Sequence, residues 1–134
     1  MSISNIMDDR TVEVLRRFGA SWDQTKTRFN EIIAQDDYFK RQIRIREFIA
    51  RLELAEGRKR YRLGTSIDKL IISRSVNHGL REDQKYISIE VIGRDDYEVS
   101  LREGSKTYRQ YRIKDLEDIR LTKLLQTLES TLVN

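Results

Sequence analysis

The chain has 134 residues, of which 38% are hydrophobic and 36% charged, and its formal net charge is +4. This length fits one domain with a single core, and the high charged share predicts a thin core under a well-solvated surface. The chain has no proline and no cysteine, and the absence of cysteine excludes disulfides and thiolate metal sites. No apolar run approaches the roughly 18 residues of a membrane-spanning helix, so we expect a cytoplasmic protein with no membrane partner.

The N-terminal part of the chain shows helical periodicity after a short stretch without any. Residues 1–7 are expected to form a flexible leader. A short helix is predicted to begin at Asp8 or Asp9, because an acidic side chain caps the first turn, and to end at Gly19. Ser21 is predicted to cap a second helix.

A third helix is the clearest element in the pattern. Asp36 and Asp37 suit its start, where a carboxylate meets the helix dipole favourably, and Gly57 stands just past its end. Its apolar residues recur at helical spacing, and they are Ile45, Phe48, Ile49, Leu52 and Ala55.

From residue 58 the apolar period changes to two, which predicts five short strands over residues 58–114. The run Leu70 to Ile72 predicts a central strand buried on both faces. The facing of the fifth strand, residues 106–113, stays open in the pattern. The alternating residues expected to face the helices are Tyr61, Leu63, Ile87, Ile89, Val91, Tyr97, Val99 and Leu101.

A last helix is predicted over residues 115–133, with Asp115 as its cap. Leu116, Ile119 and Leu124 widen its apolar arc beyond a single stripe. The stripe suits either packing on the sheet or a seam with a second copy of the chain, so a homodimer through this helix is open. Its members are Leu121, Leu125, Leu128 and Leu132.

Together these elements predict an α+β fold. N-terminal helices (residues 8–57), an antiparallel five-stranded meander (58–114) and a C-terminal helix (115–133) form a single domain over residues 8–134. Strands joined by short turns are antiparallel, and helices grouped outside the strand run pack on one face of the sheet.

The sequence is poor in catalytic signatures. His78 is the single histidine, so it cannot build a multi-histidine zinc site, and we interpret it as a solvated loop residue. The acidic pairs suit helix starts and turns, and no glycine-rich phosphate loop is present. We therefore expect a non-enzymatic protein with no cofactor and no metal.

Positive charge gathers in the strand region. Residues 58–114 hold 14 Lys and Arg against 8 Asp and Glu, and five of the six tyrosines. The alternation predicts a set of cations and rings on the outer face of the sheet, namely Arg60, Arg62, Tyr86, Arg102, Tyr108 and Arg112.

A surface of this composition fits two kinds of partner. Protein interfaces enrich Tyr and Arg, whereas single-stranded nucleic acid takes cations on its phosphates and rings on its bases. Glu90, Asp96 and Glu98 fall on the same face and weaken its positive field. We therefore expect a small protein-binding module (an adaptor, inhibitor or immunity-type protein), with nucleic-acid binding as the alternative and an enzyme built on His78 as a third hypothesis.

Overall fold

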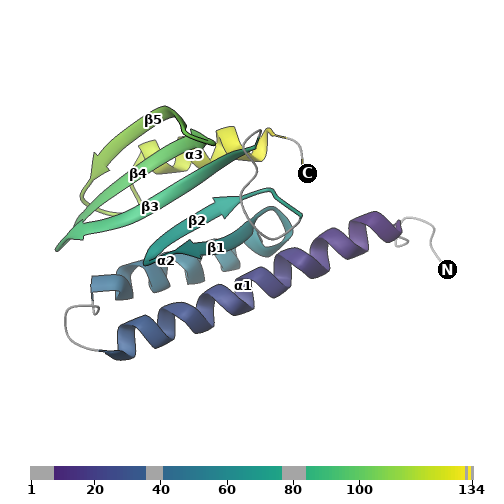
Figure 1. The fold of residues 1–134 in the computed structure, drawn as a ribbon, viewed down its shortest axis with the longest axis horizontal. Helices are drawn as coiled ribbons and strands as arrows, with labels where there is room; N and C mark the ends of the chain where they lie inside the picture. The colour runs from purple at the N-terminus through teal and green to yellow at the C-terminus, as the bar shows by residue number, and fades with distance from the viewer. Residues whose placement is uncertain (1–7, 36–40, 77–83, 132, 134) are drawn as a thin grey trace.

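The computed structural model describes residues 8–35, 41–76, 84–131 and 133 and shows an α+β fold (Figure 1). Each strand pairs antiparallel with the next along the chain, in the order β1-β2-β3-β4-β5. The predicted fold class, with helices on both sides of a five-stranded meander in the sequence, is confirmed. The elements are α1 (Asp9–Gln35), α2 (Ile43–Leu54), the 3-10 helix η3 (Gly57–Lys59), β1 (Arg62–Ser66), β2 (Lys69–Ser73), β3 (Lys85–Gly93), β4 (Asp96–Glu103), β5 (Lys106–Ile113) and α3 (Ile119–Glu129).

Some predicted features fall outside the described residues. These are the leader at residues 1–7, the helix start at Asp36 and Asp37, the loop that holds His78, and Leu132.

The two short N-terminal helices predicted from the sequence are one helix, α1, so that prediction is wrong. Gly19 and Ser21 both lie inside it. A mid-helix glycine costs about 1 kcal/mol relative to alanine, but the buried stripe of the helix continues across it at spacings of four and three residues. The stripe therefore outweighs the local stop signal, and its members are Phe18, Trp22, Thr25, Phe29 and Ile32.

Helix α1 runs along the outer edge of β1 and closes it (Figure 1). The Oγ of Ser21 accepts a hydrogen bond from the backbone N–H of Leu63 at 3.0 Å. The indole Nε1 of Trp22 donates to the backbone oxygen of Tyr61 at 2.9 Å. Two helix side chains thus take the place of a neighbouring strand, which protects this edge from pairing with another chain.

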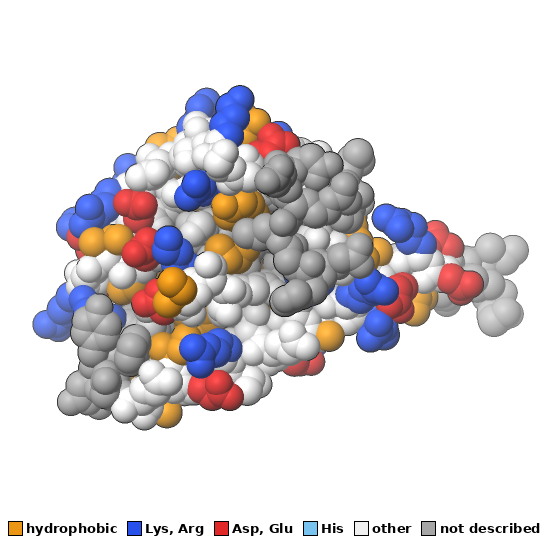
Figure 2. Space-filling model, in the orientation of Figure 1, with side chains coloured by type: hydrophobic (Ala, Val, Ile, Leu, Met, Phe, Trp, Pro, Cys, Tyr) orange, Lys and Arg blue, Asp and Glu red, His pale blue; other side chains and the backbone are white. Residues whose placement is uncertain are grey.

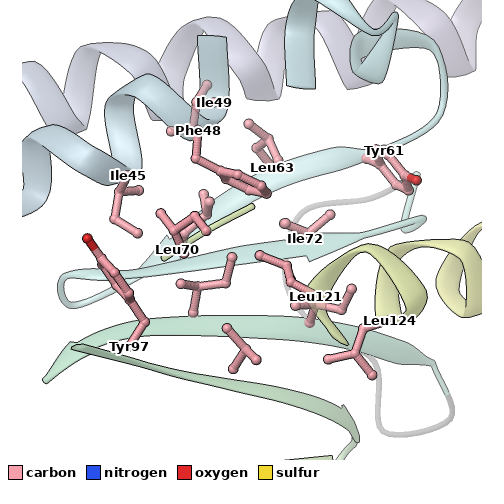
Figure 3. Packing of buried hydrophobic residues seen from close by; sticks show 14 of the residues in the cluster. Ile45, Phe48, Ile49, Tyr61, Leu63, Leu70, Ile72, Tyr97, Leu121 and Leu124 are labelled. Carbon is pink, nitrogen blue, oxygen red and sulfur yellow. The ribbon is translucent and has the colours of Figure 1, made fainter. Parts of the chain in front are cut away.

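Helices α2 and α3 cover one face of the sheet and complete the core (Figure 3). The strand residues predicted to face them are buried, except that Val91 is half-buried and packs against the core. The prediction for β2 is also confirmed, because Leu70 and Ile72 are buried on the helix side while Ile71, on the other face, is only 8% exposed. The helices contribute Ile45, Phe48, Ile49, Leu121, Leu124 and Leu128.

The later helices agree with the prediction at one boundary and differ at another. Helix α2 ends at Leu54, so Gly57 stands past its end as predicted, but the left-handed residue there is Glu56, with φ 64°, and Gly57 begins η3. Asp118, not Asp115, caps α3, because its Oδ1 accepts the backbone N–H of Arg120 at 2.9 Å. Asp115 makes a turn just before this helix, and Ile119 is 62% exposed, outside the apolar arc predicted for it.

The leucines of α3 pack on the sheet of their own chain. Leu121, Leu124 and Leu128 are buried, and Leu125 is half-buried against the same core. These side chains therefore pack within the core of a single chain. A homodimer through this helix stays a prediction with no structural support.

Candidate binding face of the sheet

The face of the sheet that α2 and α3 leave uncovered, called here the open face, lies toward the viewer in Figure 1. Its side chains come from the strand positions that alternate with the buried ones. Strand register sorts them into three rows that cross the sheet, which we call the arginine row, the small-residue row and the charged row.

The arginine row brings together three of the six predicted site residues. Arg62 pairs in register with Ser73, Ser73 with Tyr86, and Tyr86 with Arg102. Register partners that are directly opposite on neighbouring strands lie within about 5.5 Å of each other. Arg62, Tyr86 and Arg102 therefore form one line over four strands, although the first and the last are 40 positions apart in the chain.

The two arginines of this row have no carboxylate partner among the described residues. The Nη1 of Arg62 donates to the backbone oxygen of Val76 at 2.9 Å. Burial, with Arg17 nearby, lowers the pKa of Arg62 from its ordinary value. The Nε of Arg102 is buried and makes no hydrogen bond. A guanidinium that is partly withdrawn from water without a counter-ion is unfavourable, so an anion bound here would stabilise both groups.

Next to the arginines runs the small-residue row, which keeps the centre of the open face shallow. Ser88 pairs with both Ile71 and Ser100, so the row continues across the strands. Gly64 leaves open space where a Cβ would stand. Sequence reasoning missed this floor, although serines alternating with buried aliphatic residues in β3 and β4 are visible in the chain. The row consists of Gly64, Ile71, Ser88, Ser100 and Gln110.

A hollow of about 490 Å³ adjoins both rows where α1 meets β1 and β2. Arg28 of α1 and Arg62 of β1 lie on its walls, and Ile71 forms part of its lining. The Nη1 of Arg28 lies 3.6 Å from Glu31, in an exposed ion pair. Thr25, Thr65, Ser66 and Ser73 also line it.

The charged row crosses the other end of the open face, and there the charges compensate one another. Lys69 lies 3.4 Å from Glu90, and Glu90 pairs in register with Glu98. Arg112, a predicted site residue, makes two hydrogen bonds of 2.8 Å to Asp96 and holds the pKa of that carboxyl below its usual value. Figure 2 shows cationic and acidic side chains side by side at this end, on the left of the view.

Arg60 was expected on the outer face of the sheet, but it lies outside β1 and binds helix residues instead. Its Nη1 lies 3.3 Å from both carboxylate oxygens of Glu129 in α3, and its Nη2 donates to the backbone oxygen of Ala55. The prediction is wrong because η3 delays the start of the strand until Arg62.

Tyr108 also departs from its predicted position, because β5 carries a β-bulge. Leu101 pairs with Arg109 but Arg102 pairs with Thr107, so Tyr108 is an extra residue that reverses the alternation. Its hydroxyl donates to Glu103 at 2.5 Å, and the Nζ of Lys106 lies 4.6 Å from its ring. Since Glu103 alternates with Arg102, Tyr108 lies on the helix side of the sheet.

A second hollow, of about 380 Å³, lies between α2, the β3–β4 turn and residues 114–117. Arg44 and Glu47 form an ion pair of 3.0 Å on its wall. Burial, with Asp95 nearby, raises the pKa of Tyr97 above its ordinary value. Cations and acids alternate around this hollow among the residues that the structure describes.

Two further observations concern the described parts of the chain. No group of three or more His, Cys, Asp or Glu side chains there is arranged to hold a metal ion. None of the helices found there combines the length and the apolar character needed to cross a membrane.

Comparison with known proteins identifies no relative. No family model matches the chain, and neither a curated protein nor a solved structure matches it.

Proposed function

We propose that this chain is a small non-catalytic module that binds an acidic surface of a partner protein on its open face. The observation that carries the proposal is that Arg62 and Arg102 share one row and both lack a carboxylate partner among the described residues. Partly buried, unpaired guanidinium groups next to a tyrosine are the composition of an interface hot spot. Carboxylates of a partner would accept bidentate hydrogen bonds from them.

The distribution of tyrosines favours a protein over nucleic acid. Of the tyrosines in the strand region, Tyr86 alone among the described residues lies on the open face. Tyr61 and Tyr97 are buried, and Tyr108 and Tyr111 lie on the helix side, packed against the core. Binding of single strands uses a series of rings on which successive bases stack, whereas the described residues of the open face offer one ring.

The acids of the charged row support the same choice. Glu90, Asp96 and Glu98 share the open face with the arginines, so a phosphate backbone that crosses the face from the arginine row would meet carboxylates. A protein partner can match cations at one end and mixed charges at the other. A non-enzymatic role and a cytoplasmic location belong to the same proposal.

The test compares partner capture by three immobilised forms of the full chain. The double variant Arg62→Ser and Arg102→Ser removes the two unpaired cations. The matched control, Arg44→Ser and Arg120→Ser, removes two cations that are paired with Glu47 and Asp118. All three are expected to give the same circular dichroism spectrum.

We expect at least a tenfold loss of affinity for an acidic protein partner in the double variant, and less than a threefold loss in the control. Equal loss in both forms would contradict the proposal. If the captured molecule is single-stranded RNA or DNA, and its binding falls steeply with salt, the nucleic-acid alternative is correct.

A further inference from the structure

The two edges of the sheet are not alike. At β1, Ser21 and Trp22 of α1 satisfy edge groups of the strand. At β5, no other element within the described residues makes a backbone hydrogen bond to the outer edge. Five of the eight residues of β5 are exposed, and the strand is the outermost one in Figure 1. One edge is therefore closed and the other is available for pairing.

The available edge is strongly cationic. From residue 106 to residue 114 the chain contains Lys106, Arg109, Arg112 and Lys114 and no acid. Asp96 neutralises Arg112, whereas neither Arg109 nor Lys114 has a carboxylate within 4 Å among the described residues. Like charges facing each other across a strand pair are unfavourable. The edge is thus unsuited to a second copy of itself and complementary to an acidic strand.

The backbone of β5 limits the part of this strand that can pair with a strand of a partner. The bulge at Tyr108 disrupts the ladder near the β4–β5 turn. From Arg109 to Ile113 the register is regular, and the Nη1 of Arg109 donates to the carbonyl oxygen of Tyr108 at 2.8 Å. The exposed side chain of Arg109 thus occupies the carbonyl oxygen of Tyr108, which lies beside the regular stretch. If that side chain moves away, the same oxygen can accept a hydrogen bond from a backbone N–H of a partner.

We propose that the outer edge of β5 accepts an extended acidic segment of a partner protein as a sixth strand, along Arg109–Ile113. Main-chain hydrogen bonds to the edge supply affinity, and carboxylates opposite Arg109 and Lys114 supply specificity. The inference is independent of the proposed role of Arg62 and Arg102, because it uses a different surface.

The experiment follows backbone amide hydrogen exchange by NMR in the full chain as a seven-residue peptide is added. The peptide consists of valine and threonine with two glutamates five positions apart, so that one glutamate lies opposite Arg109 and the other opposite Lys114. We expect alternate amides in Arg109–Ile113 to exchange at least tenfold more slowly in the complex, because only alternate residues point their N–H at a free edge. Amides of β1 should not change. A peptide of the same sequence with alternate amides N-methylated keeps the charge, and we expect it to give no protection.

The outcomes separate this inference from the proposed function. Protection of β5 should persist in the Arg62→Ser and Arg102→Ser variant and fall at least fivefold in the Arg109→Glu and Lys114→Glu variant. Equal protection by the N-methylated peptide, or binding that involves the open face without β5, would contradict the proposal that a partner adds a sixth strand. Neither result would contradict the proposed role of the open face. Concentration-dependent protection of β5 without peptide would show that a second copy is the occupant, which also contradicts the sixth-strand proposal.

Discussion

Gly57 lies against the indole ring of Trp22 so closely that a Cβ at residue 57 would come within 2.8 Å of the ring carbons Cη2 and Cζ2. The same Cβ would lie 2.7 Å from the backbone oxygen of Leu52. Trp22 is fully buried and is fixed by its hydrogen bond to Tyr61. The glycine thus allows η3 to pack between α1 and α2, which sets the start of β1.

Replacing Gly57 by alanine should therefore destabilise the fold. The ring and the backbone oxygen have little room to move, and overpacking of this kind typically costs about 1–3 kcal/mol. Urea unfolding measures the change. Gly64→Ala is the matched control, because nothing lies within 4 Å of its Cβ position, and we expect it to change stability by less than about 1 kcal/mol. Equal losses in both variants would contradict the packing argument.

Ser21 provides a second test, at the closed edge of the sheet. Its hydroxyl accepts the N–H of Leu63 and donates to the carbonyl oxygen of Phe18. Ser21→Ala leaves the buried Leu63 N–H without an acceptor, which should cost about 1–3 kcal/mol. The exposed Ser66 serves as control, since Ser66→Ala is expected to change stability by less than about 0.5 kcal/mol. Chemical denaturation that finds Ser21→Ala as stable as the unmodified chain would show that water replaces the bond.

Ile67 stands in the turn between β1 and β2 with φ 59°, in the left-handed region. A β-branched side chain is strained there, and Ile67 is 86% exposed, so burial does not compensate. Ile67→Gly should raise the free energy of unfolding by about 1 kcal/mol. The comparison is Ile92→Gly, which has no positive φ and should lower it. Thermal unfolding would contradict this account if both variants were destabilised equally.

The buried Tyr61 side chain should lower the stability of the fold at alkaline pH. Burial, with Glu129 nearby, raises the pKa of Tyr61 to about 12. Below pH 10 its phenol is neutral in both states. As the pH rises from 10 to 12 the unfolded chain releases this proton while the folded chain retains it, so unfolding becomes easier by about 2 kcal/mol. The decline should be shallower in Tyr61→Phe, measured by urea unfolding at a series of pH values. Parallel declines in the two proteins would exclude this cause.

The sheet was predictable because its physical cause is local. One buried face and one solvated face produce a period of two along each strand, and the run from Leu70 to Ile72 reports burial on both sides. The register then follows from short turns, such as the Gly104 turn between β4 and β5. Hence the facing of Ile87 and Val99 could be read from the chain alone.

The remaining features depend on contacts between distant residues. Arg60 finds its carboxylate at Glu129, 69 positions later in the chain, and no local pattern signals that pair. Tyr108 is displaced by a bulge, which leaves no mark in the alternation apart from the unclear facing of the fifth strand. Gly19 has the local signature of a helix end. The helix continues through it because Phe18 and Trp22, on either side of this glycine, belong to one buried stripe that packs on the sheet edge.

The side chains of the open face provide the most direct measurement, by NMR titration of arginine Nε–H groups with a hexaglutamate peptide at low salt. The account predicts saturable shifts of the Arg62 and Arg102 signals, while Arg112 and Arg58, which are paired with Asp96 and Asp23, shift much less. Shifts of Arg62 and Arg102 that are no larger than those of Arg112 and Arg58 would contradict the claim that the open face is an acid-binding surface.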